Sequence, residues 1–209
     1  MRGALAMRMA FALAALGYGP GLQAHTVAAQ EKVENAPDPF VHLTGATFPA
    51  WIGDFRRVSV YRYDDQGADM SIGYNLIRNG RKLAAVTFYI YPSYFRAAEA
   101  DNAARCDRDF HEIVKSIEKQ HEGVVPRRAD APRPPDGITG TTKFASYRYE
   151  EVFDTRPQPL RSDAWLSCRP HSDWLITYRA SWPESNDVSS DVEQLLHAIN
   201  WPHTLPKDD

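Results

Sequence analysis

Three pairs of tyrosines, with the two members of each pair two positions apart, are the residues of this sequence best suited to bind a ligand. They are Tyr61 and Tyr63, Tyr89 and Tyr91, and Tyr147 and Tyr149. Side chains two apart on a β-strand point to the same face, so neighbouring strands would combine these rings and hydroxyl groups into one aromatic surface. Such a surface suits a small molecule, a glycan or an envelope protein. The alternative is that the tyrosines pack beneath helices or at a partly wetted edge.

The two cysteines, Cys106 and Cys168, are candidates for a disulfide bond. Cys106 falls on the apolar stripe of an expected helix, and Cys168 shares one face of an expected strand with Ala164 and Leu166. Both side chains should therefore point inward. A bond between them would close a loop of about 60 residues and stabilise the fold by about 4 kcal/mol in the chain-entropy model. The alternative is two separate buried thiols.

A weak metal-binding pattern surrounds His111. The sequence His-Glu-Ile-Val-Lys begins like the HExxH helix of zinc enzymes, but Lys115 stands where the second histidine ligand would be. Asp107 and His111 are one helical turn apart and could hold part of a metal site, although a solvated contact between them is the simpler interpretation. The sequence therefore predicts no cofactor and keeps Asp107 and His111 as an alternative site.

Residues 1–29 are expected to be a signal peptide. Arg2 and Arg8 provide a basic start, and the apolar stretch over 9–18 is shorter than the roughly 20 residues that span a bilayer. Ala24 and Ala29 each fit a cleavage site, and both positions stay open. The mature chain is then expected to be periplasmic or secreted, without stable membrane insertion. The alternative is an uncut N-terminal anchor.

The charge balance argues against nucleic acid as a partner. The formal net charge is −3 at pH 7, and loss of the predicted signal peptide would make it more negative by removing two arginines. The sequence contains no block of Lys and Arg that would follow a phosphate backbone. It also lacks the GxSxG motif of hydrolases and a glycine-rich phosphate loop.

After the signal peptide, the chain divides into a flexible N-terminal segment, residues 30–50, and a single domain, residues 51–203. The segment is polar and contains three prolines. Alternating apolar and polar residues predict strands over 57–63, 70–76, 83–91, 143–153, 164–168 and 174–182. In the first of these strands, Val58 and Val60 are expected to point inward together.

Two helices are expected, one after each group of three strands. The first covers about 94–120, and the second starts at a capping box formed by Ser190 and Glu193. The chain therefore reads as βββα twice. This order predicts an α+β fold in which an antiparallel sheet of about six strands has two helices packed on it.

The order of elements over 48–202 resembles the PsbP/Mog1-like architecture, in which helices flank an antiparallel sheet. The stretch 48–91, with its segment Trp51–Phe55, is also similar to exported bacterial proteins. The resemblance implies a binding or assembly accessory rather than an enzyme. We therefore expect an exported, non-catalytic binding or accessory protein of the cell envelope. The alternative is a metal-assisted envelope hydrolase centred on Asp107 and His111.

Overall fold

The computed structural model describes residues 30–93, 102–169 and 172–202. The strands and helices, in chain order, are β1 (Glu31–Lys32), β2 (Phe40–Val41), β3 (Thr47–Phe48), β4 (Trp51–Ile52), β5 (Phe55–Arg62), β6 (Met70–Arg78), β7 (Arg81–Pro92), α1 (Asn102–Gln120), β8 (Val125–Arg127), β9 (Thr141–Phe153), β10 (Arg156–Cys168), β11 (Trp174–Pro183) and α2 (Ser189–Ala198). None of the helices in these ranges is long and apolar enough to cross a membrane.

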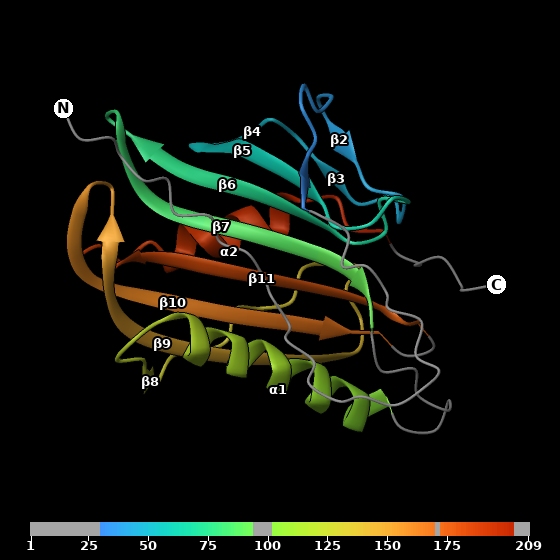
Figure 1. The fold of residues 1–209 in the computed structure, drawn as a ribbon. Helices are drawn as coiled ribbons and strands as arrows, with labels where there is room; N and C mark the ends of the chain where they lie inside the picture. Colours follow the sequence, from blue (N-terminus) through green and yellow to red (C-terminus); the bar gives the residue numbers. More distant parts are fainter. Residues whose placement is uncertain (1–29, 94–101, 170–171, 203–209) are drawn as a thin grey trace, which may run out of the picture.

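One antiparallel sheet of nine strands organises the molecule (Figure 1). Its strand order is β1-β5-β6-β7-β11-β10-β9-β8, with β4 paired to β5 outside this path, while β2 and β3 form a separate two-stranded sheet. The two halves of the chain meet at β7 and β11, where Ile90 lies opposite Ile176 and Phe88 lies opposite Tyr178. The main sheet is therefore continuous across the whole domain.

The expectation of about six strands in a βββα-βββα order is wrong. The main sheet has nine strands, four short strands precede the first long one, and β8 lies between α1 and β9. These additional strands are two or three residues long, too short for an alternating pattern to repeat. The α+β class, the antiparallel sheet and the helices α1 and α2 agree with the prediction.

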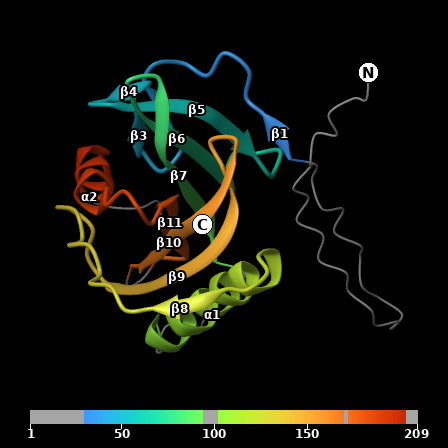
Figure 2. The same ribbon diagram turned by 90° about the vertical axis from the view of Figure 1, so that its left-hand side faces the viewer.

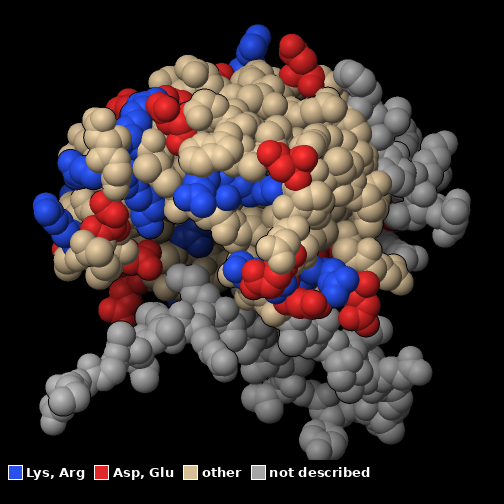
Figure 3. Space-filling view, turned by 90° about the horizontal axis from the view of Figure 1, so that it is seen from above, with Lys and Arg blue, Asp and Glu red and all other residues tan. Residues whose placement is uncertain are grey.

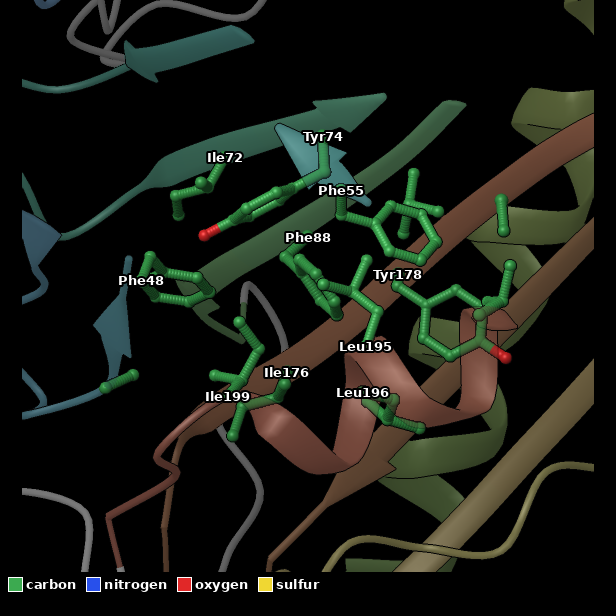
Figure 4. Close-up of a cluster of buried hydrophobic side chains, with 14 of the residues drawn as sticks. Phe48, Phe55, Ile72, Tyr74, Phe88, Ile176, Tyr178, Leu195, Leu196 and Ile199 are labelled. Atoms are coloured by element: carbon green, nitrogen blue, oxygen red, sulfur yellow. The ribbon is translucent and has the colours of Figure 1, made fainter. Parts of the chain in front are cut away.

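The face of the sheet that α2 covers, called here the α2 face, holds the largest hydrophobic cluster (Figure 4). Alternate residues of the central strands point to it, and the predicted stripe of α2 packs onto them. The buried members include Ile72, Tyr74, Phe88, Ile176, Tyr178, Leu195, Leu196 and Ile199. Full burial of one such side chain contributes roughly 1.5–3 kcal/mol, so this cluster is the main reason that α2 docks on the sheet.

The opposite face, called here the α1 face, is partly covered by α1. Figure 2 shows the two helices on different sides of the sheet, with α1 beside β9. The buried side chains of Cys106 and Ile117 come from the apolar stripe of α1 and contact residues of β9, β10 and β11. A disulfide joins Cys106 to Cys168, with 5.8 Å between the Cα atoms, and confirms the predicted pair. The start of the expected helix, 94–101, lies outside the described residues.

The start of α2 differs from the predicted capping box. The residue at the N-cap is Val188, and no side chain caps the helix there, so Ser190 lies inside the first turn. Instead, the backbone N–H and the hydroxyl of Ser189 donate to the carboxylate of Asp187 at 3.1 and 2.7 Å. The prediction failed because the aspartate two positions before the helix takes the first free N–H.

A β-bulge in β5 changes the direction of Val58. The register with β6 shifts between Arg57 and Ser59, which leaves Val58 as the additional residue. Its side chain is 45% exposed, whereas Val60 is buried in the main cluster. The expectation that both valines point inward is therefore wrong for Val58. The bulge depends on how β5 pairs with β6. The alternation of residues within one strand contains no information about that pairing.

Residues 30–50 contribute to the folded body. They contain β1, β2 and β3, and the side chains of Phe40 and Phe48 belong to the main hydrophobic cluster. Arg57 of β5 binds the same segment by donating from Nη2 to the carbonyl of Pro37 at 2.6 Å and from Nη1 to that of Phe48. The prediction of a flexible segment rested on its polar composition, which does not reflect the few residues that anchor it to the domain.

Charged side chains of both signs are interspersed over the surface shown in Figure 3. The described residues include exposed ion pairs, such as Arg78 with Asp54 and Lys115 with Glu112. Exposed pairs of this kind contribute between zero and about 1 kcal/mol to stability.

Candidate functional site

The α1 face carries all six tyrosines that the sequence singled out. Four of them come from the β5 to β7 half of the sheet, where Tyr61 lies opposite Ser71 and Ser71 lies opposite Tyr89. Tyr63, just beyond β5, joins this group because its hydroxyl is hydrogen bonded to that of Ser71 at 3.0 Å. Tyr91 lies two positions further along β7, and all four tyrosines are half-buried.

Tyr147 and Tyr149 lie apart from this group. They belong to β9, which β10 and β11 separate from β7, and each is only 4% exposed. Tyr147 packs against Ile117 of α1, and Tyr149 packs against Val124. These two residues therefore fit the alternative interpretation, in which the tyrosines pack beneath a helix, and the six rings do not form one uninterrupted surface.

Arg179 of β11 stands between the two groups of tyrosines. Its Nη2 donates to the hydroxyl oxygen of Tyr149 at 3.1 Å, and its Nη1 donates to Oε1 of Gln120 at 3.2 Å. On the other side, burial raises the pKa of Tyr89 to about 12, with Tyr63 raising and Arg179 lowering it. Tyr89 is therefore protonated at neutral pH, and its hydroxyl lies within the electrostatic reach of both neighbours.

The strand register places small residues on both sides of Arg179 on this face. Gly73 and Thr87 occupy the same cross-strand row on one side of it, and Ala164 and Ala145 occupy the row on the other side. All four neighbours are small, so none extends as far from the sheet as the guanidinium group. Arg179 is therefore the charged member of this cross-strand row.

His121, one residue after α1, completes the cluster around Arg179. Its imidazole stacks on the ring of Tyr149, with 4.1 Å between centroids, and its Nε2 accepts a hydrogen bond from Nη2 of Arg179. Nδ1 lies 3.2 Å from Oε2 of Glu151 and therefore carries the proton. Burial and then the charge of Arg179 lower the pKa of His121 to about 4. The net pKa is lowered even though the carboxylate of Glu151 lies close to Nδ1, so the imidazole is neutral at pH 7.

Both ring nitrogens of His121 are engaged by neighbouring side chains. A histidine that acts as a general base needs a free nitrogen near the group that loses its proton. Here Arg179 occupies Nε2 of His121 and Glu151 occupies Nδ1. The nearby hydroxyls of Ser162 and Ser181 bond to each other at 3.1 Å. The guanidinium group is held by two acceptor oxygens, those of Gln120 and Tyr149, and by the neutral, stacked ring of His121.

The alternative pair, Asp107 and His111, lies on α1. The carboxylate of Asp107 is bound by Nζ of Lys143 at 2.6 Å, and His111 is exposed. Within the described ranges, no group of three or more His, Cys, Asp and Glu residues is placed to hold a metal ion. The assignment of a metal to this pair remains a prediction.

Two surface depressions lie away from the tyrosines. The larger, of about 470 Å³, is at the edge formed by β8 and β9 and includes Arg127, Asp130 and Ser146. The smaller, of about 270 Å³, lies among Arg81, Arg156 and other residues near the strand turns. Both are lined by charged residues and neither contains a tyrosine. We therefore place the candidate site on the α1 face, around the tyrosines and Arg179.

Sequence reasoning did not find Arg179 or His121. A local pattern does point to the first: Thr177, Arg179 and Ser181 alternate with buried residues along β11, which marks a polar row on the α1 face. The position of His121 depends instead on how α1 lies across the sheet. No local pattern encodes that orientation.

No protein-family model, no curated protein and no solved structure matches the chain. The function is therefore argued from the geometry of the α1 face.

Proposed function

We propose that this chain is an exported, non-catalytic binding or accessory protein of the cell envelope. Its ligand or partner binds the α1 face between Tyr63 and Arg179. The observation that carries the proposal is the linked series of groups across this face. It runs from the Tyr63 hydroxyl to Ser71, across to Tyr89, and on to Arg179 with its support from His121.

The chemistry of this series favours a particular kind of ligand. Half-buried aromatic rings offer apolar contact, their hydroxyls donate hydrogen bonds, and the guanidinium group adds one positive charge. A glycan or an extended peptide with one acidic group matches all three properties. The ligand therefore belongs to the predicted range of small molecule, glycan or envelope protein.

Support for the cellular address comes from the cysteines. The bond between Cys106 and Cys168 joins two fully buried side chains that are 62 positions apart. Structural disulfides are rare in reducing compartments and persist in the periplasm and outside the cell. The predicted signal peptide, residues 1–29, lies outside the described residues, so export itself belongs to the proposal.

The proposal is tested by screening acidic and neutral cell-wall oligosaccharides and short peptides against isotope-labelled protein by NMR. Binding should shift the backbone amide signals of Ser71, Thr87, Tyr89 and Arg179. Replacing Tyr89 and Tyr91 together by alanine should weaken the affinity of any ligand so found at least tenfold while the domain stays folded.

The matched control removes a tyrosine hydroxyl from the opposite face. Tyr74 points to the α2 face and donates to the carbonyl of Pro49 at 2.6 Å, so Tyr74→Phe should leave the affinity unchanged. Ligands whose signals map only to the α2 face, or an affinity unaffected by the tyrosine replacements, would reject the assignment of the binding face.

A further inference from the structure

A buried arginine at the end of β10 has no anionic partner among the described residues. Arg169 is 4% exposed and follows directly after Cys168, the last residue of the strand. Its Nη2 donates to the carbonyl of Gly137 at 3.0 Å, but Nε and Nη1 are both buried without a hydrogen-bond partner in the described part of the chain. No carboxylate of the described residues lies within ion-pair distance of it. Burial lowers its pKa.

An unpaired buried cation of this kind is costly. Moving a charge out of water is offset in folded proteins by an opposite charge or by hydrogen bonds to every polar atom, and native structures rarely omit both. Two other arginines, one buried and one partly buried, differ in this respect. Arg105 is paired with Asp173 at 2.5 Å, and Arg161 is paired with Asp163 at 2.7 Å.

The strand register places further free donors around Arg169. Cys168 and Leu175 are the last paired residues of β10 and β11, and Arg169 and Trp174 are the next residues of the two segments. Trp174 points to the α2 face, where it belongs to the main hydrophobic cluster. Ser167 lies on the same face, two positions before Arg169 along β10, at a spacing of about 7 Å. The indole Nε1 of Trp174 and the hydroxyl of Ser167 are also buried without a partner in the described ranges. Trp174 is 5% exposed and Ser167 is 1% exposed.

The unpartnered atoms have one property in common, which is that they can donate hydrogen bonds. Guanidinium and indole N–H groups cannot accept a hydrogen bond at all, and a serine hydroxyl can donate one. Such a set is unsuited to a cation or to a donor ligand. It suits an acceptor with negative charge.

We propose that Arg169, Trp174 and Ser167 form a buried anion-binding site for the carboxylate group of a small ligand. A single uncompensated positive charge is neutralised by one negative charge, so a monoanion fits better than phosphate, whose second charge would remain unpaired. The flat pair of carboxylate oxygens also matches guanidinium N–H groups. The site lies on the α2 face, opposite the tyrosines, and does not depend on the proposed function.

The surroundings of the site are well ordered by packing. His42 contacts Trp174 edge to face, with 5.6 Å between ring centroids, and Ile138 follows the glycine that accepts from Arg169. Burial lowers the pKa of His42 to about 4, although the backbone of Ala68 and Gly67 raises it, so His42 adds no charge at pH 7. The selectivity of the site for an anion therefore depends on the charge of Arg169.

The experiment is calorimetric titration of the full protein with formate and acetate at constant ionic strength, with inorganic phosphate as the comparison anion. We expect one saturable site for the carboxylates and binding of phosphate at least tenfold weaker. Saturation should also raise the melting temperature, by roughly 5 to 10 °C at a hundredfold excess over Kd.

Three variants separate this site from general salt effects. Arg169→Met should weaken carboxylate binding at least tenfold, and Trp174→Phe, which removes the indole N–H, should weaken it severalfold. Arg156→Met is the matched control because it removes an exposed arginine of β10, and it should bind as the wild type does. A role for Arg169 in folding alone would lower the stability of Arg169→Met without any carboxylate response in the wild type.

Three results would overturn the proposal. They are the absence of saturable formate and acetate binding, binding that persists in Arg169→Met, and preference for phosphate. If Arg169→Met does not fold, a high-resolution crystal structure of the wild type grown in formate decides the question. A carboxylate bound to Arg169 supports the site, whereas water alone at that position refutes it.

Discussion

The imidazole of His121 lies flat on the phenol ring of Tyr149, with an angle of 19° between the two planes. This stack is the point at which the end of α1 meets β9. Because Arg179 also contacts both residues, the stack ties the helix end to the central strand β11. It is thus a support of the proposed ligand site as well as a packing contact.

Acid should destabilise the protein through His121 and His42. The pKa of each is lowered to about 4 in the folded state, by burial first in both cases, with Arg179 as a further cause for His121. The unfolded chain, with pKa near 6.5 for histidine, then binds more protons than the folded chain between pH 6.5 and 4. The stabilisation is present above pH 6.5 and is lost as the pH falls towards 4.

Urea unfolding at pH 7.5 and 4.5 measures this effect. His121→Gln should reduce the loss of unfolding free energy between pH 7.5 and pH 4.5, because only His42 of the two buried histidines then remains to titrate. His111→Gln, which changes an exposed residue of α1, should leave the loss as it is. Equal losses in the wild type and in His121→Gln would show that His121 does not contribute.

Reduction of the disulfide should lower the free energy of unfolding by about 4 kcal/mol in the chain-entropy model. The double variant Cys106→Ser with Cys168→Ser should show a similar loss in urea, and a reducing agent should affect it no further. The intact mass of the wild type should rise by about 2 Da on reduction, as two hydrogens are added to the bonded pair. Insensitivity of wild-type stability to reductant would argue against a structural role for the bond.

Gly73→Ala should be destabilising because β5 approaches β6 closely at this position. A Cβ atom on residue 73 would lie 2.4 Å from Oγ of Ser59. We expect a loss of about 1–3 kcal/mol, as for other overpacked positions. Ser59→Ala removes the clashing oxygen, so combining it with Gly73→Ala should restore most of the stability. A double variant no more stable than Gly73→Ala would place the strain elsewhere.

The buried pair of Arg161 and Asp163 should be sensitive to loss of one partner. The guanidinium group donates to both carboxylate oxygens, at 2.9 and 2.7 Å, and Ser146 donates to one of them at 2.6 Å. Asp163→Asn leaves the arginine charge buried and unpaired, which costs about 3–5 kcal/mol in comparable pairs. Chemical denaturation measures the loss.

Two controls test whether burial is the cause. Replacing both partners, Arg161→Met with Asp163→Leu, should recover much of the stability because no charge remains buried. Asp54→Asn removes an exposed partner of Arg78 and should change the free energy of unfolding by less than about 1 kcal/mol. A loss of similar size in Asp163→Asn and Asp54→Asn would contradict the argument.

Each of the six long strands of the sheet was located by its alternation, but the prediction of 164–168 covered only the end of β10, Arg156–Cys168. In β6, for example, Ile72 and Tyr74 alternate with Ser71 and Gly73, and the two pairs do face opposite sides of the sheet. The short strands could not be predicted in this way. β1 is defined by its pairing with residues about 30 positions away, where Lys32 lies opposite Tyr61.

The candidate site was predictable only in part. The spacing of two residues placed the tyrosines on one face because that property belongs to a single strand. The proximity of Arg179, His121 and Tyr149 depends on the order of β9, β10 and β11 and on the angle of α1 above them. Those features follow from packing between distant segments. The same is true of Arg169, whose missing partner becomes visible only when its surroundings are known.

The covalent bond of α1 lies near one end of the helix, at Cys106, whereas Gln120 and His121 at the other end are held by hydrogen bonds and stacking. Any outward movement of this helix must therefore be a rotation about its fixed end, and the far end travels the greatest distance. The disulfide thus fixes one end of α1 to the sheet, and the contact between Arg179 and His121 opposes movement of the other end.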